Sequence, residues 1–210
     1  MNSIIWDWNG TLLDDLDVCI SCINTLLKNR NLPLLNREGY KEVFSFPVKN
    51  YYEKIGFDFS KEDFSIPAHQ FIDLYEKKIK KCPLHPAALK ILNYFQKNGV
   101  RQFVLSAMHQ KMLEQTLKHN KIFDYFEGVA GLSDHYAVSK IDRGHYLIDK
   151  FQIEKNNVQI IGDTIHDFEV AQELGIRCIL VADGHQSYYR LKKTDAIVIE
   201  KLEQLTLNKI

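Results

Sequence analysis

Cysteine is scarce in this chain of 210 residues, which contains only four, at Cys19, Cys22, Cys82 and Cys178. Four thiols, scattered in this way, are too few for a disulfide framework. Cys19 and Cys22 have the spacing of half a zinc or redox site, but no second pair of cysteines or histidines completes it. Since both lie in a helical pattern, we expect two buried helix thiols.

An excess of one charge and a long apolar run are also missing. The 27 Lys and Arg residues balance 27 Asp and Glu residues, which gives no support for a nucleic-acid partner or an anionic membrane. No apolar run approaches the ~20 residues that span a bilayer, and no signal peptide is visible. Hydrophobic residues make up 45% of the chain, which is ample for a packed core. We expect a soluble cytoplasmic protein, monomeric or homodimeric, that binds neither membrane nor nucleic acid.

The segment "IIWDWNGTLL", residues 4–13, contains an Asn-Gly pair of the kind found in tight β-hairpins. A hairpin needs a second strand, whereas apolar residues after Gly10 recur every three or four positions, which predicts a helix that Asp14 and Asp15 begin. These apolar residues are Leu13, Leu16, Ile20, Ile23 and Leu27. The segment is therefore interpreted as a buried strand that ends at Asp7 and Asn9, followed by a turn that glycine permits.

Short buried strands alternate with helices along the second half of the chain. Strands are predicted at 103–105, 127–131, 158–161, 176–181 and 196–199, and helices at about 109–120, at 142–151 and through Ala171 and Leu174 up to Gly175. This alternation predicts an α/β fold with a doubly wound parallel sheet. Ligands of such sheets bind beyond the carboxyl ends of the strands.

Residues 15–83 break this alternation, with helical patterns around 16–30 and 62–81 and no convincing strand. We interpret them as a helical cap domain (15–83) inserted into a core domain made of residues 1–14 and 84–210. The cap is rich in aromatic residues, most of which we expect in the cap's own core and some in an apolar wall over the site. These are Phe44, Phe46, Tyr51, Tyr52, Phe57, Phe59 and Phe64.

Polar side chains follow four of the predicted strands, and the topology brings them to one crevice. They are Asp7 with Asn9, then Ser106, then Lys140, then Asp163 with Asp167. Singly, the acids and the serine have an ordinary explanation as helix caps, and the lysine as a surface residue. Together they suit phosphoryl transfer with Mg²⁺, which prefers carboxylate oxygens. A carboxylate can attack phosphorus, and Ser106 and Lys140 can bind the transferring oxygens.

The same residues resemble the haloacid dehalogenase (HAD) superfamily, most closely its phosphoglycolate-phosphatase-type members. Residues 7–12, Asp-Trp-Asn-Gly-Thr-Leu, are similar to the first family motif, Asp-x-Asp-Gly-Thr-Leu. Ser106 and Lys140 match the second and third motifs, and residues 162–167, Gly-Asp-Thr-Ile-His-Asp, match the fourth. The order of the motifs and the position of the cap agree over essentially the whole chain.

This resemblance implies a Rossmann-type core and a Mg²⁺-dependent phosphatase that acts on a small phosphorylated metabolite. It implies that Asp7 is the nucleophile and a metal ligand, that Asp163 is a metal ligand, that Asp167 binds or orients the metal site, and that Asn9 gives its backbone carbonyl to the metal. Thr11, Ser106 and Lys140 are implied to bind phosphate. The resemblance also implies a cap that opens about hinges near 13–15 and 82–85.

Asn9 departs from the family pattern, in which a second aspartate protonates the leaving alcohol and then activates water. An amide cannot do this, and such acid-base catalysis is typically worth ~10²–10⁴-fold in rate. Three interpretations stay open. The protein is a slow phosphatase that favours good leaving groups, such as acyl or aryl phosphates, or that recruits His109 or His166. Alternatively, it binds a phosphorylated ligand or regulates a partner, or it belongs to a HAD branch whose chemistry does not use that aspartate.

Three further expectations concern the site. A receiver domain, which also phosphorylates an aspartate on an α/β sheet, is disfavoured by the cap insertion and by residues 162–167. His185 is expected to be an exposed loop histidine, with contact to a leaving group as the alternative. Because Asn-Gly is prone to deamidation, conversion of some Asn9 to aspartate is a third hypothesis.

Overall fold

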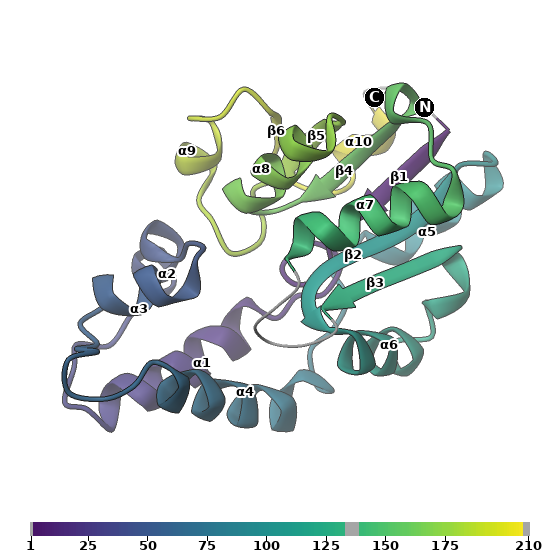
Figure 1. The fold of residues 1–210 in the computed structure, drawn as a ribbon. Helices are drawn as coiled ribbons and strands as arrows, with labels where there is room; N and C mark the ends of the chain where they lie inside the picture. The colour runs from purple at the N-terminus through teal and green to yellow at the C-terminus, as the bar shows by residue number, and fades with distance from the viewer. Residues whose placement is uncertain (1, 133–138, 208–210) are drawn as a thin grey trace.

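The strand that carries Asp7 at its end lies in the middle of a six-stranded parallel sheet of order β3-β2-β1-β4-β5-β6 (Figure 1). The computed structural model describes residues 2–132 and 139–207. The strands are β1 (Ser3–Trp6), β2 (Arg101–His109), β3 (Gly128–Leu132), β4 (Val158–Gly162), β5 (Arg177–Val181) and β6 (Ile197–Ile199). The predicted α/β class with a parallel sheet is confirmed. The hairpin is excluded, because β1 pairs in parallel with β2 and β4.

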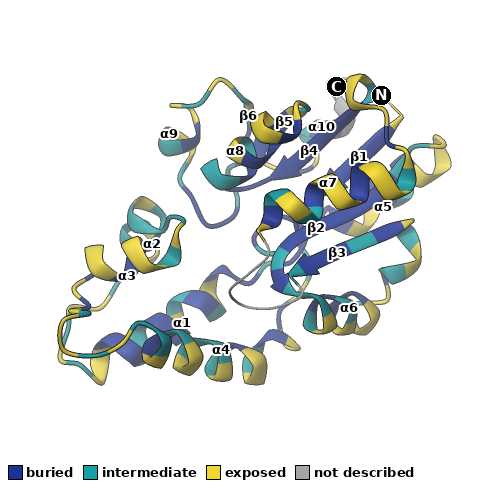
Figure 2. Ribbon diagram, viewed as in Figure 1, coloured by how far each residue is buried: buried dark blue, intermediate teal, exposed yellow. Residues whose placement is uncertain are grey.

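Helices cover both faces of the sheet, so its strands are almost wholly buried (Figure 2). Side chains alternate between the faces: Ile4 and Trp6 of β1 belong to one hydrophobic cluster, and Ile5 belongs to the other. Helices α5 (Ala88–Lys97), α6 (Gln110–His119) and α10 (Gln204–Leu207) pack on the first face. Helices α7 (Lys140–Phe151) and α8 (Ile165–Leu174) pack on the second. The short helices η1 (Phe123–Tyr125), η2 (Lys155–Asn157) and α9 (Tyr188–Leu191) lie in connections.

Four helices follow β1 before the chain reaches α5: α1 (Leu16–Lys28), α2 (Arg37–Val43), α3 (Val48–Lys54) and α4 (Ser65–Ile79). They lie to one side of the sheet, with α1 packed against α4 (Figure 1). The helical patterns around 16–30 and 62–81 are thereby confirmed. The two connections to the sheet run side by side, since the Asp14 amide donates to the Pro83 carbonyl and the His85 amide donates to the Leu12 carbonyl, both at 2.9 Å.

Some predicted bounds were wrong. The strand predicted at 103–105 extends to His109, because β2 resumes pairing with β3 at His109 and Leu132 after a register shift that begins beyond Leu105. Ser106 is therefore the first residue after the regular pairing, although the strand continues past it.

All four cysteines are buried free thiols, as expected for Cys19 and Cys22 in α1. Among the described residues, no helix is both long and apolar enough to cross a membrane.

Candidate active site

The turn after β1 brings the backbone of Gly10 against Asp163 and His185, which come from the second half of the chain. The Trp8 carbonyl accepts hydrogen bonds from the amides of Leu12 and Leu13 at 3.1 and 3.0 Å, which closes the turn. Gly10 has a φ of 73°, and a Cβ there would lie 2.4 Å from both the Asp163 carboxylate and the His185 ring. Only glycine fits this conformation and this close approach.

Three carboxylates lie together beyond the ends of β1 and β4. Asp7, Asp163 and Asp167 each offer one oxygen to a group whose atoms all lie within 4.8 Å of one another. The Lys140 ammonium donates to Asp7 Oδ1 at 2.5 Å and to Asp167 Oδ1 at 2.6 Å. The Thr11 hydroxyl lies between Asp7 Oδ2 and Asp163 Oδ1, at 3.3 and 3.1 Å. All five side chains are buried.

The charge of this cluster is not balanced by the protein alone. Burial raises the pKa of Asp7 to about 8, although the Lys140 ammonium opposes the shift, and burial raises the pKa of Asp163 to about 6. At Asp167 burial alone would raise the pKa, but the Lys140 ammonium and the Thr164 hydroxyl together outweigh it and lower the pKa. Three carboxylates and one ammonium carry a net charge of −2 when all are ionised. A cluster of oxygen ligands with this charge fits a hard divalent cation.

Helix capping and surface exposure, the ordinary explanations for Asp167, Ser106 and Lys140, do not account for all of their contacts. Asp167 Oδ2 does cap α8, since it accepts from the Thr164 amide at 3.0 Å and the Thr164 hydroxyl at 2.7 Å, but its other oxygen binds Lys140. Lys140, the first residue of α7, is 5% exposed and so is no surface lysine. Ser106 accepts from the Met108 amide at 3.1 Å, but α6 begins only at Gln110, so Ser106 is not a helix cap.

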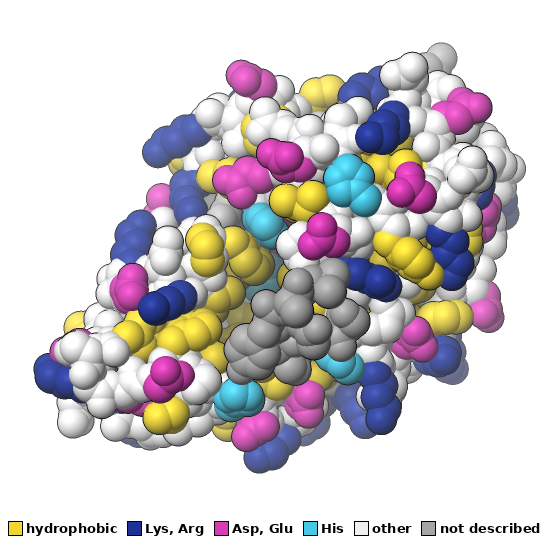
Figure 3. Space-filling model, in the orientation of Figure 1, with side chains coloured by type: hydrophobic (Ala, Val, Ile, Leu, Met, Phe, Trp, Pro, Cys, Tyr) yellow, Lys and Arg dark blue, Asp and Glu magenta, His cyan; other side chains and the backbone are white. Residues whose placement is uncertain are grey.

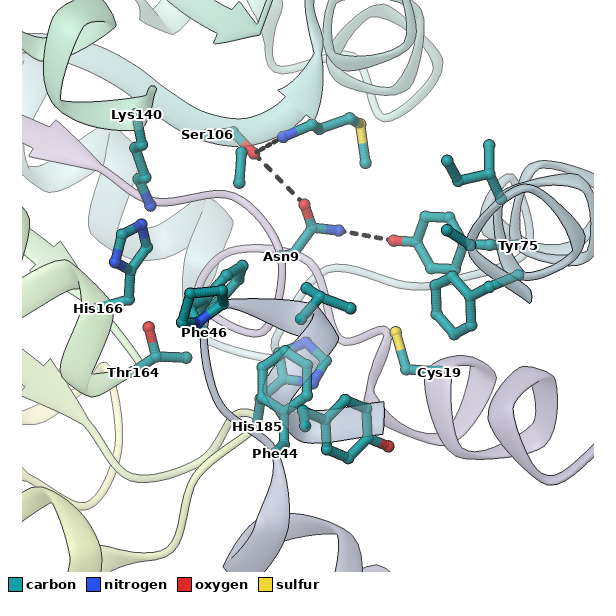
Figure 4. Close-up of a pocket in the computed structure, with 18 of the residues that line it drawn as sticks. Asn9, Cys19, Phe44, Phe46, Tyr75, Ser106, Lys140, Thr164, His166 and His185 are labelled. Carbon is teal, nitrogen blue, oxygen red and sulfur yellow. Dashed lines mark hydrogen bonds between the residues drawn. The ribbon is translucent and has the colours of Figure 1, made fainter. Parts of the chain in front are cut away.

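Asn9 is held between the core and the helices that follow β1 (Figure 4). Its Nδ2 donates to Asp15 Oδ2 at 2.9 Å and to the Tyr75 hydroxyl at 2.6 Å, while its Oδ1 accepts from the Ser106 hydroxyl at 3.4 Å. Because an ionised carboxylate only accepts hydrogen bonds, Asp15 decides which end of the amide faces it. The Asn9 carbonyl therefore faces Ser106, and the NH₂ group faces away from it.

Asp15 is the residue of the site that sequence reasoning missed. It is 1% exposed and, besides Asn9, accepts from the Gly10 amide at 2.8 Å and from the Tyr75 hydroxyl at 2.5 Å. It also pairs with His185 Nε2 at 3.2 Å. Burial alone would raise the pKa of Asp15, but His185 and these donors outweigh it and lower the pKa to about 2. The signal available was the second acid of the Asp14-Asp15 pair, which was interpreted only as the start of a helix.

The expectation that His185 is exposed was wrong, since the side chain is 4% exposed. Its Nδ1 lies 3.1 Å from the Tyr40 hydroxyl, its ring centroid lies 5.1 Å from that of Phe44, and its amide donates to Asp163 Oδ2 at 2.5 Å. Burial alone would lower the pKa of His185, but the carboxylates of Asp15, Asp163 and Asp7 together outweigh it, Asp15 most of all, and raise the pKa to about 9. Asp15 and His185 therefore form a buried ion pair beside the carboxylate cluster.

A cavity of about 490 Å³ opens above Asp7, between the sheet and helices α2–α4. Hydrophobic side chains gather around this hollow on the surface drawn in Figure 3. Five of the seven predicted aromatic residues line it, so the expectation that most serve the cap's own core was incomplete; they are Phe44, Phe46, Tyr51, Tyr52 and Phe64. His109 and His166 also line the cavity, and the His166 ring stacks on Phe46 with 4.7 Å between centroids.

The sequence profile of haloacid dehalogenase-like hydrolases matches residues 4–181. The chain therefore belongs to this family of hydrolases, as its motifs predict.

Individual relatives are distant but similar over most of their length. The chain is 22% identical to the probable phosphatase IndB of Dickeya dadantii, over 93% of this chain and 87% of the relative. It is 20% identical to a phosphoglycolate phosphatase of Pseudomonas fluorescens, over 96% of this chain and 77% of the relative. The crystal structure of a predicted phosphatase from Clostridium acetobutylicum covers 100% of this chain and 99% of its own, with 20% identity and a TM-score of 0.84. The likeness to the crystal structure establishes a shared fold.

Proposed function

We propose that this hydrolase is a Mg²⁺-dependent phosphatase that forms an aspartyl-phosphate at Asp7 from a small phosphorylated metabolite. The observation that carries the proposal is the buried group of Asp7, Asp163 and Asp167 with Lys140 bridging two of the three carboxylates. A nucleophile, a cation and oxygen ligands for a metal then lie at one point beyond the central strands.

Mg²⁺ suits the oxygen-only side chains of this cluster and their net charge. Asp7, Asp163, Asp167 and the backbone carbonyl of Asn9 would hold it, and its charge would offset that of the phosphoryl group. Its presence would also keep Asp7 ionised, which the nucleophile requires, since burial without it raises the pKa of Asp7.

The reaction then proceeds in two displacements at phosphorus. An Asp7 oxygen attacks, the bond from phosphorus to the leaving oxygen breaks, and the electron pair departs with that oxygen. Water next attacks the phosphorus of the aspartyl-phosphate, which releases phosphate and restores the carboxylate. We assign Lys140, Ser106 and Thr11 to binding the phosphoryl oxygens, where Lys140 offsets the developing charge.

Asn9 makes acid-base catalysis the weak part of this mechanism. Its carbonyl faces Ser106 and can accept a hydrogen bond, for example from a water, but it holds no proton for a leaving group. His166 is an alternative acid that the structure suggests, because it lines the cavity, precedes Asp167 in the chain and lies beside Lys140 in Figure 4.

We also propose that residues 15–83 act as a cap over the core formed by residues 1–14 and 84–210. Two observations support this division. Helices α2–α4 and the segments between them supply the aromatic wall of the cavity. The chain passes between these helices and the sheet through two segments that pair with each other, Leu12–Asp14 and Pro83–His85.

The test is steady-state release of phosphate from phosphate esters with and without Mg²⁺, on the parent protein and on Asp7→Asn, which keeps the size of the side chain. The parent is expected to release phosphate only when Mg²⁺ is present. The kcat of Asp7→Asn is expected to be lower by at least about 10³-fold, because the substitution removes the covalent step. Binding of phosphate esters with no turnover by the parent would instead favour a protein that binds a phosphorylated ligand or regulates a partner.

A further inference from the structure

We propose that the substrate is an aryl phosphate, the phosphate monoester of a phenol, whose ring occupies the aromatic chamber above Asp7. The aromatic chamber is the part of the cavity wall formed by Phe44, Phe46, Tyr51, Tyr52, Phe64 and Phe71. This inference rests on the proposed phosphatase function and narrows its substrate class. Two independent features of the molecule, the orientation of Asn9 and the wall of the chamber, point to it.

The first feature is the way in which Asp15 and Tyr75 hold Asn9. The amide NH₂ is engaged by the Asp15 carboxylate at 2.9 Å and the Tyr75 hydroxyl at 2.6 Å, so position 9 presents only its carbonyl toward Ser106. Position 9 therefore offers a leaving group neither a titratable proton nor an N–H donor. Esters of ordinary alcohols need such a proton, whereas a phenol with a pKa of about 10 can leave as its anion.

The second feature is the chemistry of the chamber wall. Five of its six rings form an unbroken series of contacts: Phe46–Phe44, Phe44–Tyr51, Tyr51–Tyr52 and Tyr52–Phe64 have centroids 5.5, 5.3, 5.5 and 5.8 Å apart, all near edge-to-face. Such walls favour another aromatic ring over a hydrated group. The volume of about 490 Å³ also falls within the range of roughly 300–1,000 Å³ for pockets that hold drug-sized ligands.

The wall is poorly suited to a small acid such as phosphoglycolate, whose carboxylate calls for a bidentate cation. Among the described residues that line the cavity there is no arginine, and the only lysine besides Lys140 is the exposed Lys49. The Lys49 ammonium lies 5.8 Å from the ring centroid of Phe59, which is not part of the wall.

The chemical step balances without a proton donor at position 9. An Asp7 oxygen forms a bond to phosphorus as the bond between phosphorus and the phenolic oxygen breaks, and the phenolate carries the electron pair away. Water then cleaves the aspartyl-phosphate, and one proton of that water reaches the phenolate through solvent. The net products are one phenol and one phosphate for each ester and water consumed.

Four substrates separate the two features. Phenyl phosphate has both a ring and a good leaving group, benzyl phosphate has the ring but leaves as an alcohol, acetyl phosphate leaves well but has no ring, and phosphoglycolate has neither. We expect phenyl and benzyl phosphate to have similar KM values, with kcat at least about 100-fold lower for benzyl phosphate, the low end of what a general acid supplies. Phosphoglycolate is expected to have the lowest kcat/KM.

A matched pair of variants tests the chamber itself. Phe46→Ala removes a half-buried ring of the wall, and Phe59→Ala removes a half-buried ring between α3 and α4 that packs behind Phe64 and does not itself line the cavity. Phe46→Ala is expected to raise KM roughly three- to tenfold for phenyl and benzyl phosphate only, the scale of one aromatic contact. Phe59→Ala is expected to leave all four KM values within about twofold.

The outcomes distinguish this inference from the function on which it rests. Equal or better kcat/KM for phosphoglycolate, equal kcat for benzyl and phenyl phosphate, or a KM increase in Phe46→Ala shared by all four substrates would each overturn the aryl assignment and leave the phosphatase standing. Absence of turnover on every substrate would overturn the phosphatase, and the aryl assignment with it.

Discussion

By the family motif, replacing Asn9 with aspartate restores the missing acid. The structure nevertheless predicts that Asn9→Asp raises the rate of hydrolysis only a little. The Asn9 NH₂ group lies 2.9 Å from Asp15 Oδ2. In Asn9→Asp, a carboxylate oxygen would take its place. Two unit charges at that distance repel by roughly 6 kcal/mol at an effective dielectric constant of about 20. This raises the pKa of the introduced carboxyl by about 4 units.

The introduced carboxyl would therefore be protonated at neutral pH, and its proton would face Asp15 rather than a leaving group on the Ser106 side. Asp15 stays ionised because His185 and the surrounding donors lower its pKa to about 2. The new O–H would donate to Asp15, as the amide does now, and the carbonyl oxygen would still face Ser106. We expect Asn9→Asp to raise the hydrolysis of benzyl phosphate by less than about tenfold, short of the ~10²–10⁴-fold typical of a positioned acid.

The double variant Asn9→Asp/Asp15→Asn exchanges the two groups and removes the repulsion. An amide at position 15 can donate to the new carboxylate and still accept from the Gly10 amide. The carboxyl at position 9 is then free to protonate a leaving group, and we expect benzyl phosphate hydrolysis to rise about 100-fold or more above the parent.

The assay is steady-state kcat and kcat/KM on benzyl phosphate with Mg²⁺, with Asp15→Asn alone as the matched control and thermal unfolding to verify folding. Peptide mass spectrometry of the parent must show intact Asn9, so that deamidation does not supply the activity. A hundredfold gain in Asn9→Asp alone, or no gain in a folded double variant, would refute the reasoning from the Asn9–Asp15 hydrogen bond.

Three further predictions concern charge, stability and motion. The pKa of His185 rises on folding from 6.5 to about 9, so its stabilisation is complete below pH 6.5 and lost as pH rises through 9. Urea titrations of Asp7→Asn, which lacks the other group whose raised pKa lies in this interval, should show the free energy of unfolding falling by up to about 3 kcal/mol over that interval. The fall should be smaller in Asp7→Asn/Asp15→Asn, and a flat profile in Asp7→Asn would count against a charged histidine. The buried Tyr51 hydroxyl has no hydrogen-bond partner among the described residues, so Tyr51→Phe should raise the free energy of unfolding by about 1 kcal/mol and the Tm by roughly 2–4 °C; a lower Tm in calorimetry would contradict this. Solution scattering with a phosphate mimic should give a smaller radius of gyration if the segments at 13–15 and 82–85 are hinges, and identical curves would argue against them.

The sheet and the carboxylate cluster were predictable because both depend on local patterns. Buried strands bounded by turn residues identify a parallel α/β sheet, and the carboxyl ends of neighbouring strands meet whatever the loops between them do. Asp7, Asp163 and Lys140 could thus be placed together from their positions at the ends of predicted segments. The extent of β2 was not predictable, because its pairing at His109 depends on a register shift against β3 rather than on its own residues.

The ion pair of Asp15 and His185 could not be predicted from sequence patterns. The two residues are 170 positions apart, and each has an ordinary local interpretation, as an acid at a helix start and as a loop histidine. Periodicity likewise shows that the aromatic residues of 15–83 have a buried face. It does not show that this face borders a hollow above Asp7, since that depends on how the helices and the sheet meet.

Charge balance gives a physical reason for an amide at position 9. The cluster of Asp7, Asp163, Asp167 and Lys140 already leaves −2 for a divalent cation to neutralise, and Asp15 with His185 forms a pair that is neutral overall. An ionised aspartate at position 9 would add a charge that neither the cation nor His185 could compensate in a buried site, where uncompensated charge is strongly disfavoured. Asn9 and Asp15 are therefore best understood as one hydrogen-bonded unit, in which the carboxylate lies six positions along the chain from where the family motif has it. The acid lost at position 9 is, on this argument, recoverable only when both residues change together.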